Sequence, residues 1–151
     1  MAIYMKFPGV DGAAHWGAKA NYHELKSFHW GADRHVPSPK SGVERKPHTP
    51  DLNEVTVTKD GDKASPLLFQ AAVSGDPQKA PTVTIDFTIG AKPGETSYMK
   101  YELENCLISS YSVRSNGGET STEELSLNFT KITYSADTNK ASFDLKQMET
   151  K

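Results

Sequence analysis

Along most of this chain apolar residues recur at every second position, which is the spacing of β-strands buried on one face. This alternation covers residues 3–7 near the N-terminus. A less regular pattern over Tyr22 to Trp30 predicts a second strand with a bulge near Leu25. Further strands are expected at residues 55–58, 82–89, 97–103, 106–114, 123–135 and 141–147. The pattern predicts a mainly β protein of seven or eight antiparallel strands, folded as a sandwich or a barrel.

One segment departs from this alternation and predicts a helix. Residues 66–74, with the sequence PLLFQAAVS, are almost entirely apolar. Ser65 directly before Pro66 is the arrangement of an N-cap followed by a first-turn proline, and Gly75 with Pro77 supplies stop signals. A helix this short does not persist alone in water, so we expect it to flank the strands and to pack against them.

A long connection without apolar periodicity runs from Arg34 to Pro50 and contains four prolines. It predicts an extended loop. Its basic residues are Arg45, Lys46 and His48. Two interpretations remain open from the residues alone: a solvated connection, or an arm that docks on a neighbouring subunit. A rigid, proline-rich arm loses less entropy on docking than a flexible one.

Composition narrows the class of protein. The 151 residues are 36% hydrophobic and 24% charged, which predicts a single domain over residues 1–151 with a real core. A balance of 17 basic and 19 acidic residues argues against the broad basic surface that nucleic-acid binding needs. No run approaches the roughly 18 apolar residues of a membrane span, and the N-terminus lacks the apolar region of a secretory signal. We expect synthesis in the cytoplasm, no nucleic-acid partner and no membrane insertion.

The sequence offers little to a catalytic interpretation. Five histidines, at positions 15, 23, 29, 35 and 48, lie in different segments without the spacing of a metal-binding motif. Phosphate-binding glycine loops and the GxSxG motif are absent. Cys106 is the only cysteine, so the chain forms no internal disulfide, and its apolar neighbours predict a buried hydrophobe. The expectation is a protein that is not an enzyme and that holds neither a cofactor nor a metal.

Several short motifs occur together in one order. The first group is Phe28-His29-Trp30-Gly31, Asp51-Leu52, Thr58-Lys59, Asp62-Lys63, Ser65-Pro66, Ser74-Gly75 and Val83-Thr84-Ile85. The second is Leu103, Leu107-Ile108-Ser109-Ser110, Gly117-Gly118-Glu119 and Glu124-Leu125-Ser126-Leu127-Asn128-Phe129. In this order they resemble the haemolysin-coregulated protein family, Hcp. The resemblance covers about Met1 to Ala136, and the ordered combination is far more specific than any single motif.

The resemblance implies a compact antiparallel β-barrel of two sheets, flanked by one helix and carrying an extended loop. Members of the family form hexameric rings that stack into the inner tube of a type VI secretion system. Implied partners are other copies of the chain, the sheath and spike of that system, and small effectors that the ring lumen chaperones and carries. Export then proceeds through this system without a cleaved signal peptide. The end of the chain near Lys151 predicts a subunit without a fused toxin domain.

The resemblance also implies roles for individual residues. His29, between Phe28 and Trp30, occupies the position that the family tends to point into the lumen, where it would contact effectors. The family favours a small polar residue there, and this chain departs from that preference. The loop from Arg34 to Pro50 resembles the family's extended loop, so Arg45, Lys46 and His48 are expected to help one ring stack on the next.

Two alternatives come from other functional classes. The first is a monomeric β-sandwich that binds a ligand such as carbohydrate, with Trp16, Trp30 and the tyrosines as a stacking platform. The second is a hydrolytic effector, which requires the scattered histidines and acidic residues to converge. The oligomeric state separates the ring subunit from the monomeric module.

Overall fold

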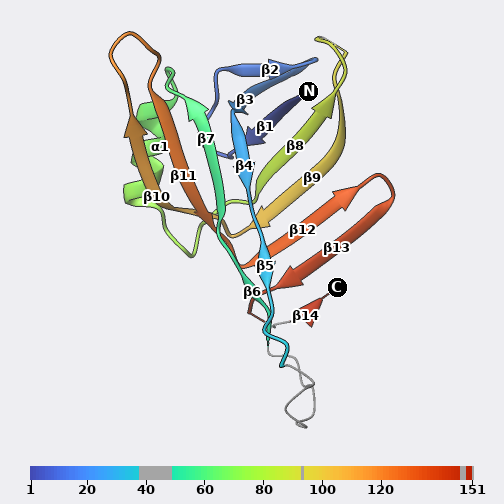
Figure 1. Ribbon diagram of the computed structural model, residues 1–151. Coiled ribbons are helices and arrows are strands. Elements are labelled where there is room, and N and C mark those ends of the chain that lie inside the picture. The colour runs from blue at the N-terminus through green and yellow to red at the C-terminus, as the bar shows by residue number, and fades with distance from the viewer. Residues whose placement is uncertain (38–48, 93, 147–148, 151) are drawn as a thin grey trace.

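The computed structural model describes residues 1–37, 49–92, 94–146 and 149–150, and shows two antiparallel β-sheets with one helix at their side (Figure 1). The large sheet has the order β14-β13-β12-β9-β8-β1-β3-β2, the small sheet β10-β11-β7-β4, and β5 pairs with β6. The bounds are β1 (Ala2–Lys6), β2 (Ala14–Trp16), β3 (Lys19–Leu25), β4 (Ser27–His29), β5 (Ala32–Asp33), β6 (Asp51–Leu52), β7 (Val55–Asp60), α1 (Ser65–Ser74), β8 (Val83–Ile89), β9 (Thr96–Glu104), β10 (Leu107–Arg114), β11 (Thr122–Asn128), β12 (Lys131–Ala136), β13 (Asn139–Asp144) and β14 (Glu149–Thr150).

The core lies between the two sheets. Met5, Ile85 and Leu103 of the large sheet pack with Val57 and Leu125 of the small sheet, and all five side chains are fully buried. Each belongs to an alternating segment, so its neighbours along the strand point outward. The predicted fold class, a β-barrel of two antiparallel sheets with one short helix, is confirmed. The strands beyond the predicted ones are mostly two or three residues long, too short to show an alternating pattern.

Two predicted strands are each divided between the sheets. The segment from Tyr22 to Trp30 was expected to be one strand, but β3 ends at Leu25 and pairs with β1, whereas β4 begins at Ser27 and pairs with β7. Residues 123–135 divide in the same way into β11 and β12. The prediction of single strands was wrong because each expected strand contains a break in its alternation. The inward residues step by three from Leu25 to Phe28 in the first segment and from Phe129 to Ile132 in the second, and the chain changes sheet at these breaks.

The single helix of the described chain, α1, packs against β10 of the small sheet. It begins one residue before the expected start and ends at the expected Ser74. Leu68 is its fully buried residue and joins the core. After the helix, a side chain at Gly75 would stand 2.9 Å from Leu107 of β10. Glycine at this position therefore ends the helix and lets β10 approach.

The large sheet extends well past the part that the small sheet covers. Figure 1 shows the β12–β13 hairpin projecting from the flank of the barrel that lies away from α1, with the short β5–β6 ribbon beside it. The predicted loop from Arg34 to Pro50 lies between β5 and β6 in the chain, but Arg45, Lys46 and His48 are outside the described residues. Within the described residues, no helix has the length and apolar character needed to cross a membrane.

Candidate functional site

The described chain gathers no catalytic or metal-binding cluster. Among the residues that the structure places, no three His, Cys, Asp or Glu side chains come together as a metal site. His15, His29 and His35 are exposed and lie on different segments. Burial raises the pKa of the Cys106 thiol to about 12, which makes it a neutral hydrophobe rather than a nucleophile. The described part of the chain thus provides the hydrolytic alternative with neither a metal cluster nor a reactive thiol.

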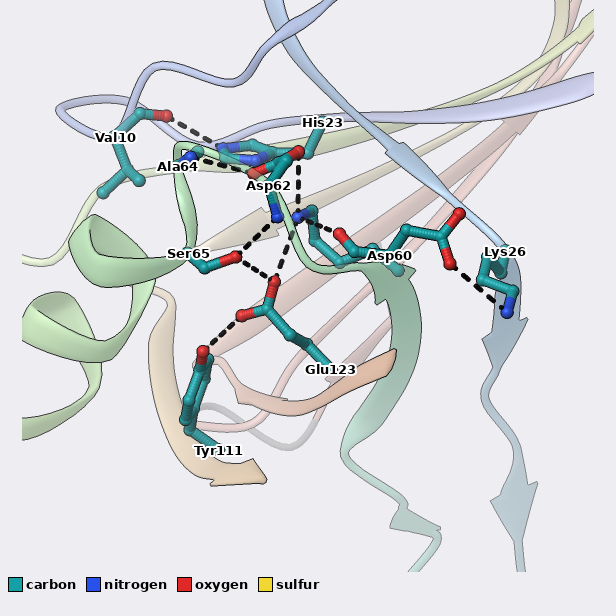
Figure 2. Close-up of polar contacts among 10 residues, drawn as sticks. Val10, His23, Lys26, Asp60, Asp62, Ala64, Ser65, Tyr111 and Glu123 are labelled. Atoms are coloured by element: carbon teal, nitrogen blue, oxygen red, sulfur yellow. Dashed lines mark hydrogen bonds and ion pairs between the residues drawn. The ribbon is translucent and has the colours of Figure 1, made fainter. Parts of the chain in front are cut away.

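A buried ion pair lies at the centre of one polar cluster, which consists of Lys59, Asp62, Ser65, Tyr111 and Glu123 (Figure 2). The side chains of Lys59 and Glu123 are each 1% exposed, and Lys59 Nζ lies 3.2 Å from Glu123 Oε1. A second carboxylate, Asp62 Oδ2, lies 3.1 Å from the same Nζ. The hydroxyls of Ser65 and Tyr111 both donate to Glu123. Burial, followed by the hydrogen bond to Glu123, raises the pKa of Tyr111 to about 12.

This polar cluster sets the start of α1. Ser65 Oγ accepts from the main-chain N–H of Asp62 at 2.9 Å and donates to Glu123 at 2.5 Å. Ala64 occupies the N-cap position and makes no side-chain cap bond. The expectation that Ser65 caps the helix was wrong, because its hydroxyl is engaged by Glu123 on β11. The residues of the cluster come from β7, α1, β10 and β11 or lie between β7 and α1, so their contacts hold these elements together. Because the buried charges are paired with each other, we interpret the cluster as structural.

His23 is fully buried beside this cluster. Its Nε2 donates to the carbonyl of Val10 at 3.0 Å, while Nδ1 has no partner within the described chain. The charged groups that act on the ring are Lys59, Asp62 and Glu123. Burial has the largest effect and lowers the pKa of His23, so the imidazole is neutral at neutral pH.

His29 lies on β4, an edge strand of the small sheet, and its side chain is exposed. Phe28 before it points into the core, with ring centroids 4.8 Å from Tyr101. His29 pairs in register with Thr56 of β7, which pairs in turn with Ser126 of β11. These three residues form a polar row on the outer surface of the small sheet. The structure thus places His29 on a polar wall, while its expected role in effector contact stays a prediction.

The two tryptophans lie in different aromatic clusters. Trp16 is 6% exposed, stacks on Tyr4 with centroids 6.0 Å apart, and is covered by the ammonium group of Lys19 at 4.2 Å. Trp30 packs edge-on to Tyr101, with centroids 5.7 Å apart. A carbohydrate platform needs open, neighbouring aromatic faces. Trp16 offers no open face, so the expected stacking platform that includes both tryptophans does not form.

An apolar cleft of about 320 Å³ lies between the β5–β6 ribbon and the β12–β13 hairpin. Its walls include Trp30, Leu52, Ile132, Tyr134 and Phe143. On the hairpin, Ile132 pairs with Phe143, so these side chains share the face that continues the inner surface of the barrel. The indole N–H of Trp30 is buried and finds no acceptor among the described residues. The cleft is core-like surface that the small sheet does not reach.

This cleft could not be recognised in the sequence. The alternation of Ile132, Tyr134 and Phe143 marks one buried strand face, but it does not show which strands extend beyond the opposing sheet. The polar cluster did leave a signal. Lys59 continues the inward phase of Val55 and Val57, and Glu123 continues that of Leu125 and Leu127, so a lysine and a glutamate at inward positions pointed to a buried pair.

Known proteins share this fold. The structure described as "Structure of a type six secretion system protein" is 21% identical, with a TM-score of 0.87 over 99% of each chain. Hcp1 from Salmonella typhimurium is 22% identical, with a TM-score of 0.79 over 99% of this chain and 98% of its own. The secreted protein Hcp3 from Pseudomonas aeruginosa is 21% identical, with a TM-score of 0.69 over 95% and 97%. No curated protein sequence matches the chain.

A sequence model of one family also matches residues 4–135, which is most of the chain, and its description is "Type VI secretion system effector, Hcp". The span agrees with the motifs found between Phe28 and Phe129. Hcp proteins are structural, non-enzymatic proteins of type VI secretion, which agrees with the prediction that the chain is not an enzyme. The chain belongs to the Hcp family of type VI secretion proteins.

Proposed function

We propose that this chain is the subunit of a type VI inner tube: six copies form a ring, and the rings stack into a tube whose lumen carries small effectors. The sheath and spike of the secretion system are its further partners, and the system exports it from the cytoplasm. Membership of the Hcp family supports this role. The observation that carries the proposal is the apolar cleft, because the described part of a single chain leaves core-like surface uncovered there, as subunits of assemblies do.

The polar outer surfaces of both sheets support a place in the wall of a water-filled tube. On the small sheet, His29, Thr56 and Ser126 form a polar row. On the large sheet, Lys100 and Glu102 alternate with core residues along β9. A subunit with two polar outer faces can turn one toward the lumen and the other toward the sheath.

Electron microscopy of the purified chain tests the proposed assembly. We expect closed rings with six-fold symmetry, some of them stacked. The monomeric ligand-binding alternative predicts particles of a single 16.6 kDa chain. Single particles at every protein concentration would contradict the proposal.

Effector contact by His29 is tested with His29→Asp, which places a charge on the polar row without touching the core. We expect less effector to co-purify with the variant, while its rings stay intact. His15→Asp, at an exposed histidine on β2, is the matched control and should keep effector binding. Equal co-purification by both variants would contradict a role for His29.

The stacking role of Arg45, Lys46 and His48 rests on the sequence resemblance alone. Each exposed ion pair contributes about 0 to 1 kcal/mol, so an effect must come from repetition around the ring. A variant with the segment between Arg34 and Pro50 shortened should give single rings and fewer tubes by electron microscopy. Tubes of normal length would contradict this role.

A further inference from the structure

The helix carries an apolar surface that the barrel does not cover. Phe69 and Val73 of α1 are 53% and 68% exposed, and their spacing of four residues places them on one helix face. Tyr111 of β10 lies beside them, with its ring centroid 6.0 Å from that of Phe69. The helix sequence, SPLLFQAAVS, contains no charged residue. We call Phe69 and Val73 the helix ridge.

The ridge and the apolar cleft lie on opposite flanks of the molecule. Figure 1 places α1 at one side of the barrel, and the β12–β13 hairpin that forms one wall of the cleft at the other. One surface is convex and the other concave. Both lack charged side chains, so bringing them together removes no charge from water.

We propose that in the ring the helix ridge of one copy packs into the apolar cleft of the next copy. This inference rests on the proposed ring, because a closed ring needs a head-to-tail contact between two different surfaces of the same chain. Two complementary surfaces on opposite flanks meet that requirement for every subunit at once. A partner other than a second copy would cover the ridge or the cleft and leave the other surface exposed.

The cleft has the size and chemistry to receive the ridge. Its volume of about 320 Å³ is at the lower end of the range for apolar binding pockets, which suits a few large side chains rather than a whole helix. Ala141 of β13 lines the cleft with a small side chain opposite Tyr134, which leaves space at the wall. The indole N–H of Trp30, which has no acceptor in the described chain, could donate a hydrogen bond to a neighbouring copy.

Two substitutions test the contact from its two sides. Phe69→Asp puts a charge on the ridge, and Ala141→Trp fills the cleft. We expect each to lower the fraction of hexamer in native mass spectrometry by about tenfold or more, because both act at the centre of the contact. The matched controls are Ile89→Asp, at a 45% exposed apolar residue of β8, and Lys140→Trp, on the outer face of β13. Denaturation midpoints close to that of the wild type would show that all four variants fold.

A cross-linking experiment adds a direct readout. Val73→Cys and Ala141→Cys, combined in one chain and treated with a short bismaleimide, should give a ladder of covalent oligomers up to six. Each single variant should give no ladder, since Cys106 is buried. If the wild type is a hexamer, two results would overturn the ridge-and-cleft contact while the ring itself stands. One is that the Phe69→Asp and Ala141→Trp variants are still hexamers, and the other is that the double cysteine variant gives no ladder. A wild-type chain that stays monomeric would overturn both.

Discussion

The polar cluster and the apolar cleft show two ways in which a strand face can end. In the polar cluster, Lys59 and Glu123 are buried at inward positions, and their charges are paired within the same chain. In the cleft, Tyr134 and Phe143 also continue an inward face, but no strand of the small sheet covers them. The first region is completed by folding, and in the proposed ring the second would be completed by a neighbouring copy.

The largest expected effect is on folding and comes from breaking the polar cluster. Glu123→Ala removes the fully buried partner of Lys59 and leaves the buried ammonium group with Asp62, a partly exposed side chain, as its remaining carboxylate. We expect a loss of about 3 to 5 kcal/mol in the free energy of unfolding, measured by urea denaturation. Glu124→Ala, at the exposed neighbouring position, should change it by about 0.5 kcal/mol or less. Equal effects would show that the buried pair does not hold this end of the barrel.

Acid should weaken the same region through His23. Its folded-state pKa lies below the ordinary value of 6.5, so the unfolded chain takes up a proton first as the pH falls. The stability present above pH 6.5 is then lost at about 1.4 kcal/mol per pH unit, down to the folded-state pKa. His23→Gln keeps a donor for Val10 but does not titrate. A pH series of unfolding curves should show a smaller loss for this variant, and parallel curves would argue against His23.

A substitution inside the cleft should leave folding almost unchanged. Trp30→Phe removes an indole N–H that has no acceptor in the described chain, so no hydrogen bond is lost. We expect the free energy of unfolding of the dissociated chain to stay constant or rise by about 1 kcal/mol. If a neighbouring copy accepts a hydrogen bond from the indole N–H, the Trp30→Phe hexamer should dissociate at a higher protein concentration than the wild-type hexamer does. A clear loss of folding stability would place this donor in a bond within the chain.

The smallest effect on folding is expected at the helix ridge. Phe69→Asp replaces a side chain that is half exposed, so the free energy of unfolding should change by about 0.5 kcal/mol or less. Leu68→Ala, one residue earlier and fully buried, is the contrasting variant and should cost about 2 to 5 kcal/mol. Similar losses for the two variants in urea denaturation would mean that Phe69 belongs to the core after all.

The sequence predicted features that depend on one strand or one helix alone, such as where that element lies in the chain. Alternation located β1, β8 and β9, and the apolar run located α1 to within one residue. The pattern was misinterpreted at Lys26, where the chain passes from β3 to β4, because the step of three residues from Leu25 to Phe28 was taken as a bulge within one strand rather than as a change of sheet. Which strands extend past the opposing sheet depends on the strand order, and no local pattern encodes that order.

The features of the candidate site also divide into those that the sequence could predict and those that it could not. The outward direction of His29 can be predicted from its place between Phe28 and Trp30, because one residue between two inward aromatics points outward. The polar row with Thr56 and Ser126 depends on the strand register, which the sequence does not show. The cleft did not follow, since it joins β5–β6 to β12–β13 over a long sequence separation. The helix ridge could not be predicted because the apolar run over residues 66–74 indicates that the helix packs against the strands but does not show which face does so. In the structure only Leu68 is fully buried.

Native mass spectrometry of the purified wild-type chain tests the central claim most directly. Six copies of the 16.6 kDa chain, about 100 kDa, are the main species that the proposed ring predicts, with ridge and cleft covering each other between neighbouring copies. The Phe69→Asp variant should shift this species to the folded monomer. A wild-type chain that remains a folded monomer across micromolar concentrations would contradict the account, because the uncovered apolar surfaces would then be stable in water without a partner.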